Sequence, residues 1–120
     1  MYKSIKKKEA WLISLQPNNF RLESTTVWSF PDRGSWVTHS GKYRGNWSPY
    51  VPRNLILRYS NPSDWVLDQF MGSGTTLVEA KLLNRHVVGV DINPQSVSIS
   101  ETNLQFQCET NSKIFTRNGN

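Results

Sequence analysis

Two short apolar runs in the second half of the chain predict strands. The first is Trp65-Val66-Leu67, which stands before Asp68. The second extends from His86 to Val90 and stands before Asp91. Short apolar runs bounded by polar residues are typical of strands that are buried in a parallel sheet. A third strand is expected from Lys113 to Thr116.

Helical spacing of apolar residues predicts helices before and after the first of these strands. Pro52 fits the first position of a helix, because it has no backbone N–H to leave unpaired there. This helix is expected to end at Ser60-Asn61-Pro62-Ser63. The next helix is predicted with Thr75 or Thr76 as its N-cap and with an end near Asn84-Arg85.

A further helix and the order of the elements indicate the fold class. Asn93 and Pro94 form a favourable N-cap and first position for a helix that we expect to extend to about Phe106. Strands that alternate with helices at this spacing imply right-handed crossovers and a parallel sheet. The prediction is an α/β fold, part of a Rossmann-like, doubly wound sheet.

The first 50 residues lack a regular apolar pattern. Val27 to Tyr50 is rich in Trp, Gly, Ser and Pro and is predicted to be a loop. We expect its tryptophans to pack on the core, with stacking on a flat ligand as the alternative, at Trp28, Trp36 and Trp47. Met1 to about Thr26 is expected to be a basic tail or peripheral segment with solvated lysines, at Lys3, Lys6, Lys7 and Lys8. Residues 27–120 are predicted to form one domain.

Composition narrows the function classes. Fourteen Lys and Arg against nine Asp and Glu give a formal charge of +5, which favours polyanionic partners but also serves solubility alone. Cys108 is the only cysteine, so an intrachain disulfide and a Cys/His zinc site are excluded, and no metal is expected. No run approaches the about 18 apolar residues of a membrane span. We expect a reducing, cytoplasmic compartment without a signal peptide or membrane anchor.

The clearest chemical feature is a glycine turn between the first predicted strand and the helix after it. Gly72 and Gly74 occupy this turn, where glycine lets the backbone approach a ligand closely. Asp91 ends the neighbouring strand, where a carboxylate can accept both hydroxyls of a ribose. Leu77 replaces the third glycine of a dinucleotide fingerprint, and no Gly-Lys-Ser/Thr of a P-loop follows. The pattern predicts a nucleoside-binding turn without a pyrophosphate cradle.

The residues around this turn resemble a known family. The run Asp68-Gln69-Phe70-Met71-Gly72-Ser73-Gly74-Thr75-Thr76 is similar to the cofactor motif Asp-Pro-Phe-x-Gly-x-Gly-Thr-Thr of DNA amino-methyltransferases, which modify adenine N6 or cytosine N4. Gln69 departs from the proline of that motif. The resemblance extends upstream through Thr38-His39 and Asn46 to Ile56, a segment that in this family helps to hold the methionine end of the cofactor.

The resemblance implies a Rossmann-like fold that binds S-adenosylmethionine and acts on DNA. It implies that Asp91 binds the cofactor ribose and that Ile92 flanks the adenine. The other residues that it places at the cofactor lie in the glycine motif, at Asp68, Phe70, Gly72, Gly74 and Thr75. For Phe70 and Ile92, ordinary core packing is the alternative.

No catalytic residue is predicted within the chain. The family's catalytic motif carries Pro-Pro before an aromatic residue, and no Pro-Pro occurs here. Ser48-Pro49-Tyr50 is the nearest approach, but it has one proline and lies inside the upstream match. We expect the catalytic motif beyond Asn120, on a downstream segment or a second chain. Cys108 needs no catalytic role, because the amino group of the base attacks the methyl group directly.

Two other functions remain open from the sequence alone. The chain is alternatively a non-catalytic nucleotide-binding module or an inactive remnant, since three strands with helices leave a sheet edge and an apolar face open. A methyltransferase that acts on RNA or protein is disfavoured by the upstream resemblance.

Overall fold

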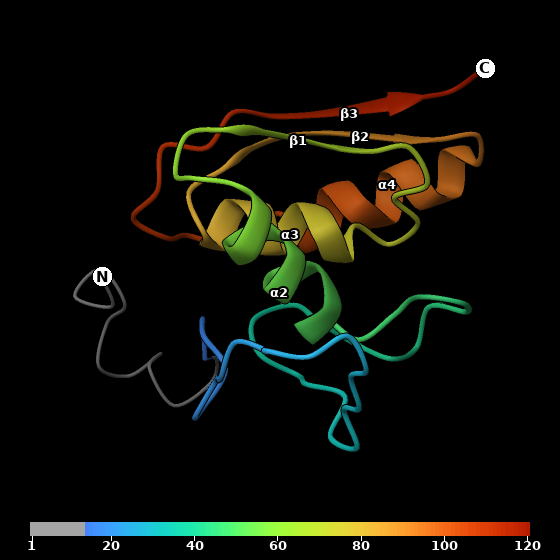
Figure 1. Ribbon diagram of the computed structural model, residues 1–120. Coiled ribbons are helices and arrows are strands. Elements are labelled where there is room, and N and C mark those ends of the chain that lie inside the picture. Colours follow the sequence, from blue (N-terminus) through green and yellow to red (C-terminus); the bar gives the residue numbers. More distant parts are fainter. Residues whose placement is uncertain (1–13) are drawn as a thin grey trace, which may run out of the picture.

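A computed structural model describes residues 14–120 as a three-stranded parallel sheet covered by helices (Figure 1). The strands lie in the order β1-β2-β3, and they are β1 (Trp65–Asp68), β2 (His86–Asp91) and β3 (Ile114–Asn118). The helices are α2 (Tyr50–Tyr59), α3 (Thr75–Leu82) and α4 (Pro94–Asn103). The α/β class and the three predicted strands are therefore confirmed.

The strands pair in a register that places apolar residues side by side. Leu67 pairs with Val88, and Val88 pairs with Phe115. Because side chains alternate between the two faces of a strand, these three residues lie on one face and their neighbours lie on the other. The last residues of β1 and β2, Asp68 and Asp91, consequently meet at the carboxyl edge of the sheet.

The core lies between the sheet and the crossover helices. Leu77, Val78 and Ala80 of α3 are almost fully buried, as is Val87 of β2. Met71, in the turn that precedes α3, joins the same cluster. Packing of α3 onto β2 thus fixes the position of the turn that connects β1 to α3.

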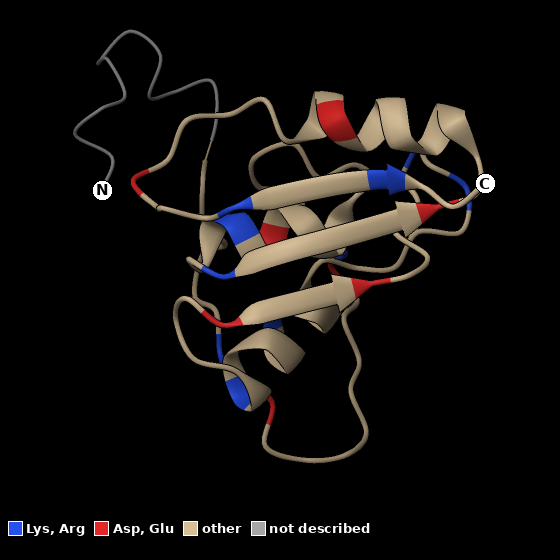
Figure 2. Ribbon diagram, turned by 90° about the horizontal axis from the view of Figure 1, so that it is seen from above, with Lys and Arg blue, Asp and Glu red and all other residues tan. Residues whose placement is uncertain are grey.

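The opposite face of the sheet is open. Both crossover helices lie on one side of the strands, and no described residue covers the other side (Figures 1 and 2). Trp65 and Leu67 are 54% and 60% exposed, and the Trp65 ring stacks on Phe115 with centroids 6.0 Å apart. The prediction that β1 is buried on both faces is wrong, because a second layer is needed to bury it. The expected open edge and apolar face are confirmed.

The start of α3 differs from the prediction. Gly74, with φ of +87°, is the N-cap, and neither Thr75 nor Thr76 caps the helix. Glycine adopts this left-handed conformation without steric cost, so the chain passes from the turn directly into the helix. Thr75 and Thr76 are instead buried in the first turn.

The bounds of the other two helices also differ. The helix α2 begins at Tyr50, so Pro52 lies inside the first turn, where backbone N–H groups have no helical partner. In α4 the predicted cap is confirmed, because Asn93 Oδ1 accepts from Gln95 N at 2.9 Å.

The helix α4 ends at Asn103 rather than at the predicted Phe106. Beyond it, Lys81 Nζ donates to the carbonyls of Leu104 and Phe106 at 2.8 and 2.6 Å. Burial lowers the pKa of the Lys81 ammonium, with the nearby Cys108 opposing this effect.

The described part of the N-terminal region forms no helix or strand before Tyr50 and packs beside α2. Glu23 N donates to Asn54 Oδ1 at 2.7 Å, and Phe20 stacks on Tyr50 at 6.3 Å. The predicted loop is confirmed, whereas the lysine-rich start lies outside the described residues. Among residues 14–120, no helix is long and apolar enough to cross a membrane.

Candidate functional site

The glycine turn is held tightly against the ends of the strands. Met71 N donates to Val90 O at 3.0 Å, and Gly74 N donates to Met71 O at 2.8 Å. Gly72 has φ of +54°, and a Cβ added to it would lie 3.1 Å from Cε1 of Tyr43. Both glycines are therefore required by the backbone path, since Gly74 has φ of +87° as well.

Asp91 ties the glycine turn to the end of β2. Its Oδ2 accepts from Gly72 N at 3.0 Å, and its Oδ1 accepts from Asn93 N at 2.9 Å. A carboxylate has about four acceptor positions, so each oxygen keeps one position for another donor. Asp91 thus stabilises the turn and can still accept hydrogen bonds from a ligand.

A second carboxylate lies at the end of the neighbouring strand. Asp68 Oδ1 accepts from Phe70 N at 3.0 Å, which shapes the chain immediately after β1. The acidic ends of two adjacent strands are visible in Figure 2. Two carboxylates at one edge of the sheet favour ligands that carry hydroxyl or ammonium groups.

A cavity of about 480 Å³ lies over this edge of the sheet. Five of the seven residues predicted at the cofactor line it, namely Asp68, Phe70, Gly72, Thr75 and Asp91. Gly74 does not line it, and an added Cβ there would point to Ser100 of α4 instead. Ile92 does not line it either, although it follows Asp91 directly.

Phe70 and Ile92 are exposed apolar side chains beside the carboxylates. Their exposed fractions are 86% and 72%, so core packing, the alternative for both residues, is wrong. Because the ring of Phe70 is exposed, it is not needed for core packing and offers a flat apolar surface to a ligand.

The opposite wall of the cavity comes from the loop before α2. It consists of Tyr43, Gly45, Asn46 and Trp47. The resemblance already covered Asn46 and Trp47 as a segment, whereas no pattern singled out Tyr43. Trp47 is 45% exposed, so packing on the core is wrong for this tryptophan and confirmed for Trp36, which is buried.

A buried ionic cluster anchors this wall to α3. Glu79 is fully buried, and its Oε1 accepts from Arg53 Nη1 at 2.7 Å. Its Oε2 accepts from Trp36 Nε1 at 2.7 Å and lies 2.7 Å from His39 Nε2. Arg53 also donates to Gln16. The cluster joins α2, α3 and the loop that leads to Tyr43.

The described residues hold no cluster suited to a metal ion. Within residues 14–120, no group of three or more His, Cys, Asp or Glu side chains is close enough to ligate one.

Comparison with known sequences agrees with this arrangement. The sequence profile of the DNA methylase family, which comprises N6 and N4 methyltransferases, matches residues 1–102. The chain belongs to this DNA methylase family. The resemblance inferred from the glycine motif is thereby confirmed.

Relatives within the family are Type II methyltransferases. M1.MboII of Moraxella bovis is 53% identical over 51 residues, covering 39% of this chain and 20% of the relative. M.MjaII of Methanocaldococcus jannaschii is 38% identical over 63 residues, covering 52% and 12%. M.BglI of Bacillus subtilis is 29% identical over 113 residues, covering 87% and 32%. The chain thus spans less than a third of the length of each of these DNA methylase relatives.

Proposed function

We propose that the chain is the cofactor-binding part of an S-adenosylmethionine-dependent DNA methyltransferase that modifies adenine N6 or cytosine N4. The observation that carries the proposal is the cavity at the carboxyl ends of β1 and β2. It brings together a glycine turn, two carboxylates and the exposed ring of Phe70. In parallel sheets, ligands bind beyond the carboxyl ends of the strands.

The chemistry of the donor set fits this cofactor. The free acceptor positions of Asp91 suit the two hydroxyls of a ribose. The apolar side chain of Ile92 would flank the adenine. Asp68 and the wall at Asn46 and Trp47 would face the methionine end, whose ammonium suits a carboxylate. S-adenosylmethionine supplies an activated methyl group on its sulfonium.

Transfer of that methyl group needs residues that we place outside the chain. We propose that the Pro-Pro-aromatic motif, absent here, is supplied by a partner segment that holds the target amino group. DNA and this segment are then the partners of the chain. Methylation of duplex DNA by the isolated chain would contradict this proposal.

Calorimetric titration of the chain with S-adenosylhomocysteine tests the cofactor site. We expect saturable binding, and we expect Asp91→Asn to weaken it about tenfold or more, because charge-assisted hydrogen bonds to the ribose are lost. Asp32→Asn is the matched control. Asp32 also accepts from a backbone N–H two residues ahead, that of Gly34 at 3.2 Å, but does not line the cavity.

The open sheet face favours a second candidate function. An inactive remnant would fold but bind no cofactor, because nothing in residues 14–120 covers the second face of its sheet. A folded chain that shows no binding of S-adenosylhomocysteine would support this candidate. Equal affinities of the Asp91→Asn and Asp32→Asn variants would place the ligand elsewhere.

A further inference from the structure

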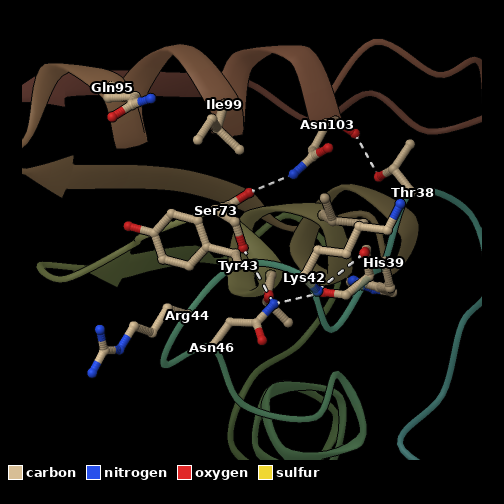
Figure 3. Close-up of a pocket in the computed structure, with 13 residues that line it drawn as sticks. Thr38, His39, Lys42, Tyr43, Arg44, Asn46, Ser73, Gln95, Ile99 and Asn103 are labelled. Atoms are coloured by element: carbon tan, nitrogen blue, oxygen red, sulfur yellow. Dashed lines mark hydrogen bonds between the residues drawn. The ribbon is translucent and has the colours of Figure 1, made fainter.

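A second cavity, of about 420 Å³, lies beside the one described above (Figure 3). The loop 38–46 forms one side, and residues of α4, Gln95, Ile99 and Asn103, form the other. No Asp or Glu is among the residues that line it. Its charge therefore differs from that of the first cavity, where Asp68 and Asp91 contribute carboxylates.

The two cavities share a partition. Tyr43, Asn46 and Thr75 line both of them. The Tyr43 hydroxyl lies 2.5 Å from Ser96 Oγ, which holds the ring against α4. Asn46 Nδ2 donates to Ser40 O at 2.8 Å, which stiffens the loop. A ligand that extends across Tyr43 would therefore reach both cavities.

Hydrogen-bond donors without partners face or border this second cavity. The side chains of Lys42, Arg44 and Gln95 form no hydrogen bond or ion pair within residues 14–120. Figure 3 shows Lys42 along the loop side, Gln95 on the opposite side, and Arg44 extended outward beyond Tyr43.

Two cations without a partner in residues 14–120, in a cavity whose lining includes no carboxylate, suit a ligand that is an anion. We propose that this cavity and its rim bind phosphate groups of the DNA backbone. The proposal rests on the proposed function, because it assumes that DNA approaches the neighbouring cofactor cavity. A strand whose base reaches across Tyr43 would carry its phosphates past Lys42 and Arg44.

The test is fluorescence anisotropy of a labelled 30-base-pair duplex titrated with the chain at several KCl concentrations. The variant is the double substitution Lys42→Gln with Arg44→Gln. We expect its affinity to fall about fivefold or more, and the slope of log affinity against log salt to fall by about two, one for each lost phosphate contact. The control is Arg21→Gln with Lys113→Gln, which removes the same two residue types from exposed positions outside the cavity.

Three results would overturn the proposal. The first is an equal loss of DNA affinity in the two double variants, and the second is a parent chain that binds no duplex. The third is that inorganic phosphate shifts the NMR signals of the backbone amides of residues 38–46 whereas the duplex does not. Titration of both variants with S-adenosylhomocysteine separates this proposal from the proposed function. We expect the affinity for S-adenosylhomocysteine to stay at the parent value, so loss of DNA binding alone identifies the phosphate site.

Discussion

At the scale of single residues, the fully buried carboxylate of Glu79 connects the core to the wall of the cavity. A buried carboxylate is tolerated only where charge and hydrogen bonds compensate its lost hydration. Here Arg53 supplies the opposite charge at Oε1 of Glu79. Trp36 and His39 contact the other oxygen, Oε2. Because Arg53 comes from α2 whereas Trp36 and His39 come from the preceding loop, the same contacts hold the wall of the cavity in place.

Replacing Glu79 by Gln should destabilise the chain strongly. The substitution leaves the buried Arg53 guanidinium without a counter-charge, which costs about 3 kcal/mol or more in free energy of unfolding. Urea unfolding measures the change. Glu101→Gln is the control, since Glu101 is exposed and its carboxylate accepts from Thr116 Oγ1, and it should change stability by less than about 0.5 kcal/mol. Similar losses in both variants would show that the buried cluster contributes nothing special.

The two kinds of site residue differed in how far the sequence could predict them. Asp68 and Gly72 stood in the glycine motif and Asp91 stood at the end of the next predicted strand, so their positions followed from local signals. The partners of Glu79 are separated from it by between 26 and 43 positions. An acidic residue in a helix is normally solvated, and only the tertiary fold shows that this one is buried.

At the scale of elements, the turn between β1 and α3 depends on Gly74 for two separate reasons. Its φ of +87° is in the left-handed region, and an added Cβ would lie 2.8 Å from Cβ of Ser100 in α4. The residue thus sets both the start of α3 and the distance between the two crossover helices.

Gly74→Ala should therefore lower the free energy of unfolding by more than the strain of the left-handed backbone alone. We expect a loss of about 2 to 4 kcal/mol in free energy of unfolding, from the left-handed backbone and from overpacking against Ser100. Gly45→Ala is a matched control, because Gly45 has φ of +84° but nothing within 4 Å of an added Cβ. That control should lose only about 1 kcal/mol. Thermal and urea unfolding compare the two, and equal losses would argue against the steric contact.

Elements were predicted more reliably than their ends and their burial. The apolar runs located β1 and β2, and Asn93-Pro94 located the start of α4, because these signals are local. The start of α3 was predicted wrongly because threonine is a favoured N-cap residue, whereas Gly74 caps the helix through its backbone conformation. The burial of β1 was misjudged, since it depends on a layer that is not part of the described residues.

At the scale of the whole molecule, residues 14–120 cover the sheet on one face only. Asp64 O accepts from His86 N at 2.9 Å, so the neighbouring backbone groups of Trp65 and Leu67 point to the unpaired edge of β1. Trp65, Leu67 and Phe115 also expose their side chains on the uncovered face. An unpaired edge beside an apolar face promotes association with other chains.

Leu67→Lys should reduce this association without lowering stability. Leu67 is 60% exposed, so a lysine can extend into solvent there and repel an apolar partner. We expect light scattering to show that the parent chain self-associates as its concentration rises, whereas the Leu67→Lys variant stays monomeric. Leu22→Lys, at a residue that is 45% exposed and outside the sheet, should associate like the parent. A monomeric parent chain would contradict this expectation.

The double contact of Asp91 has an evolutionary consequence. Since its carboxylate holds the amides of Gly72 and Asn93, selection for folding alone would keep this residue in a descendant that had lost its ligand. Phe70 and Ile92 contribute little to the core, so drift in such a descendant would first replace them with polar residues. In this chain both positions are apolar, as the proposed cofactor site requires.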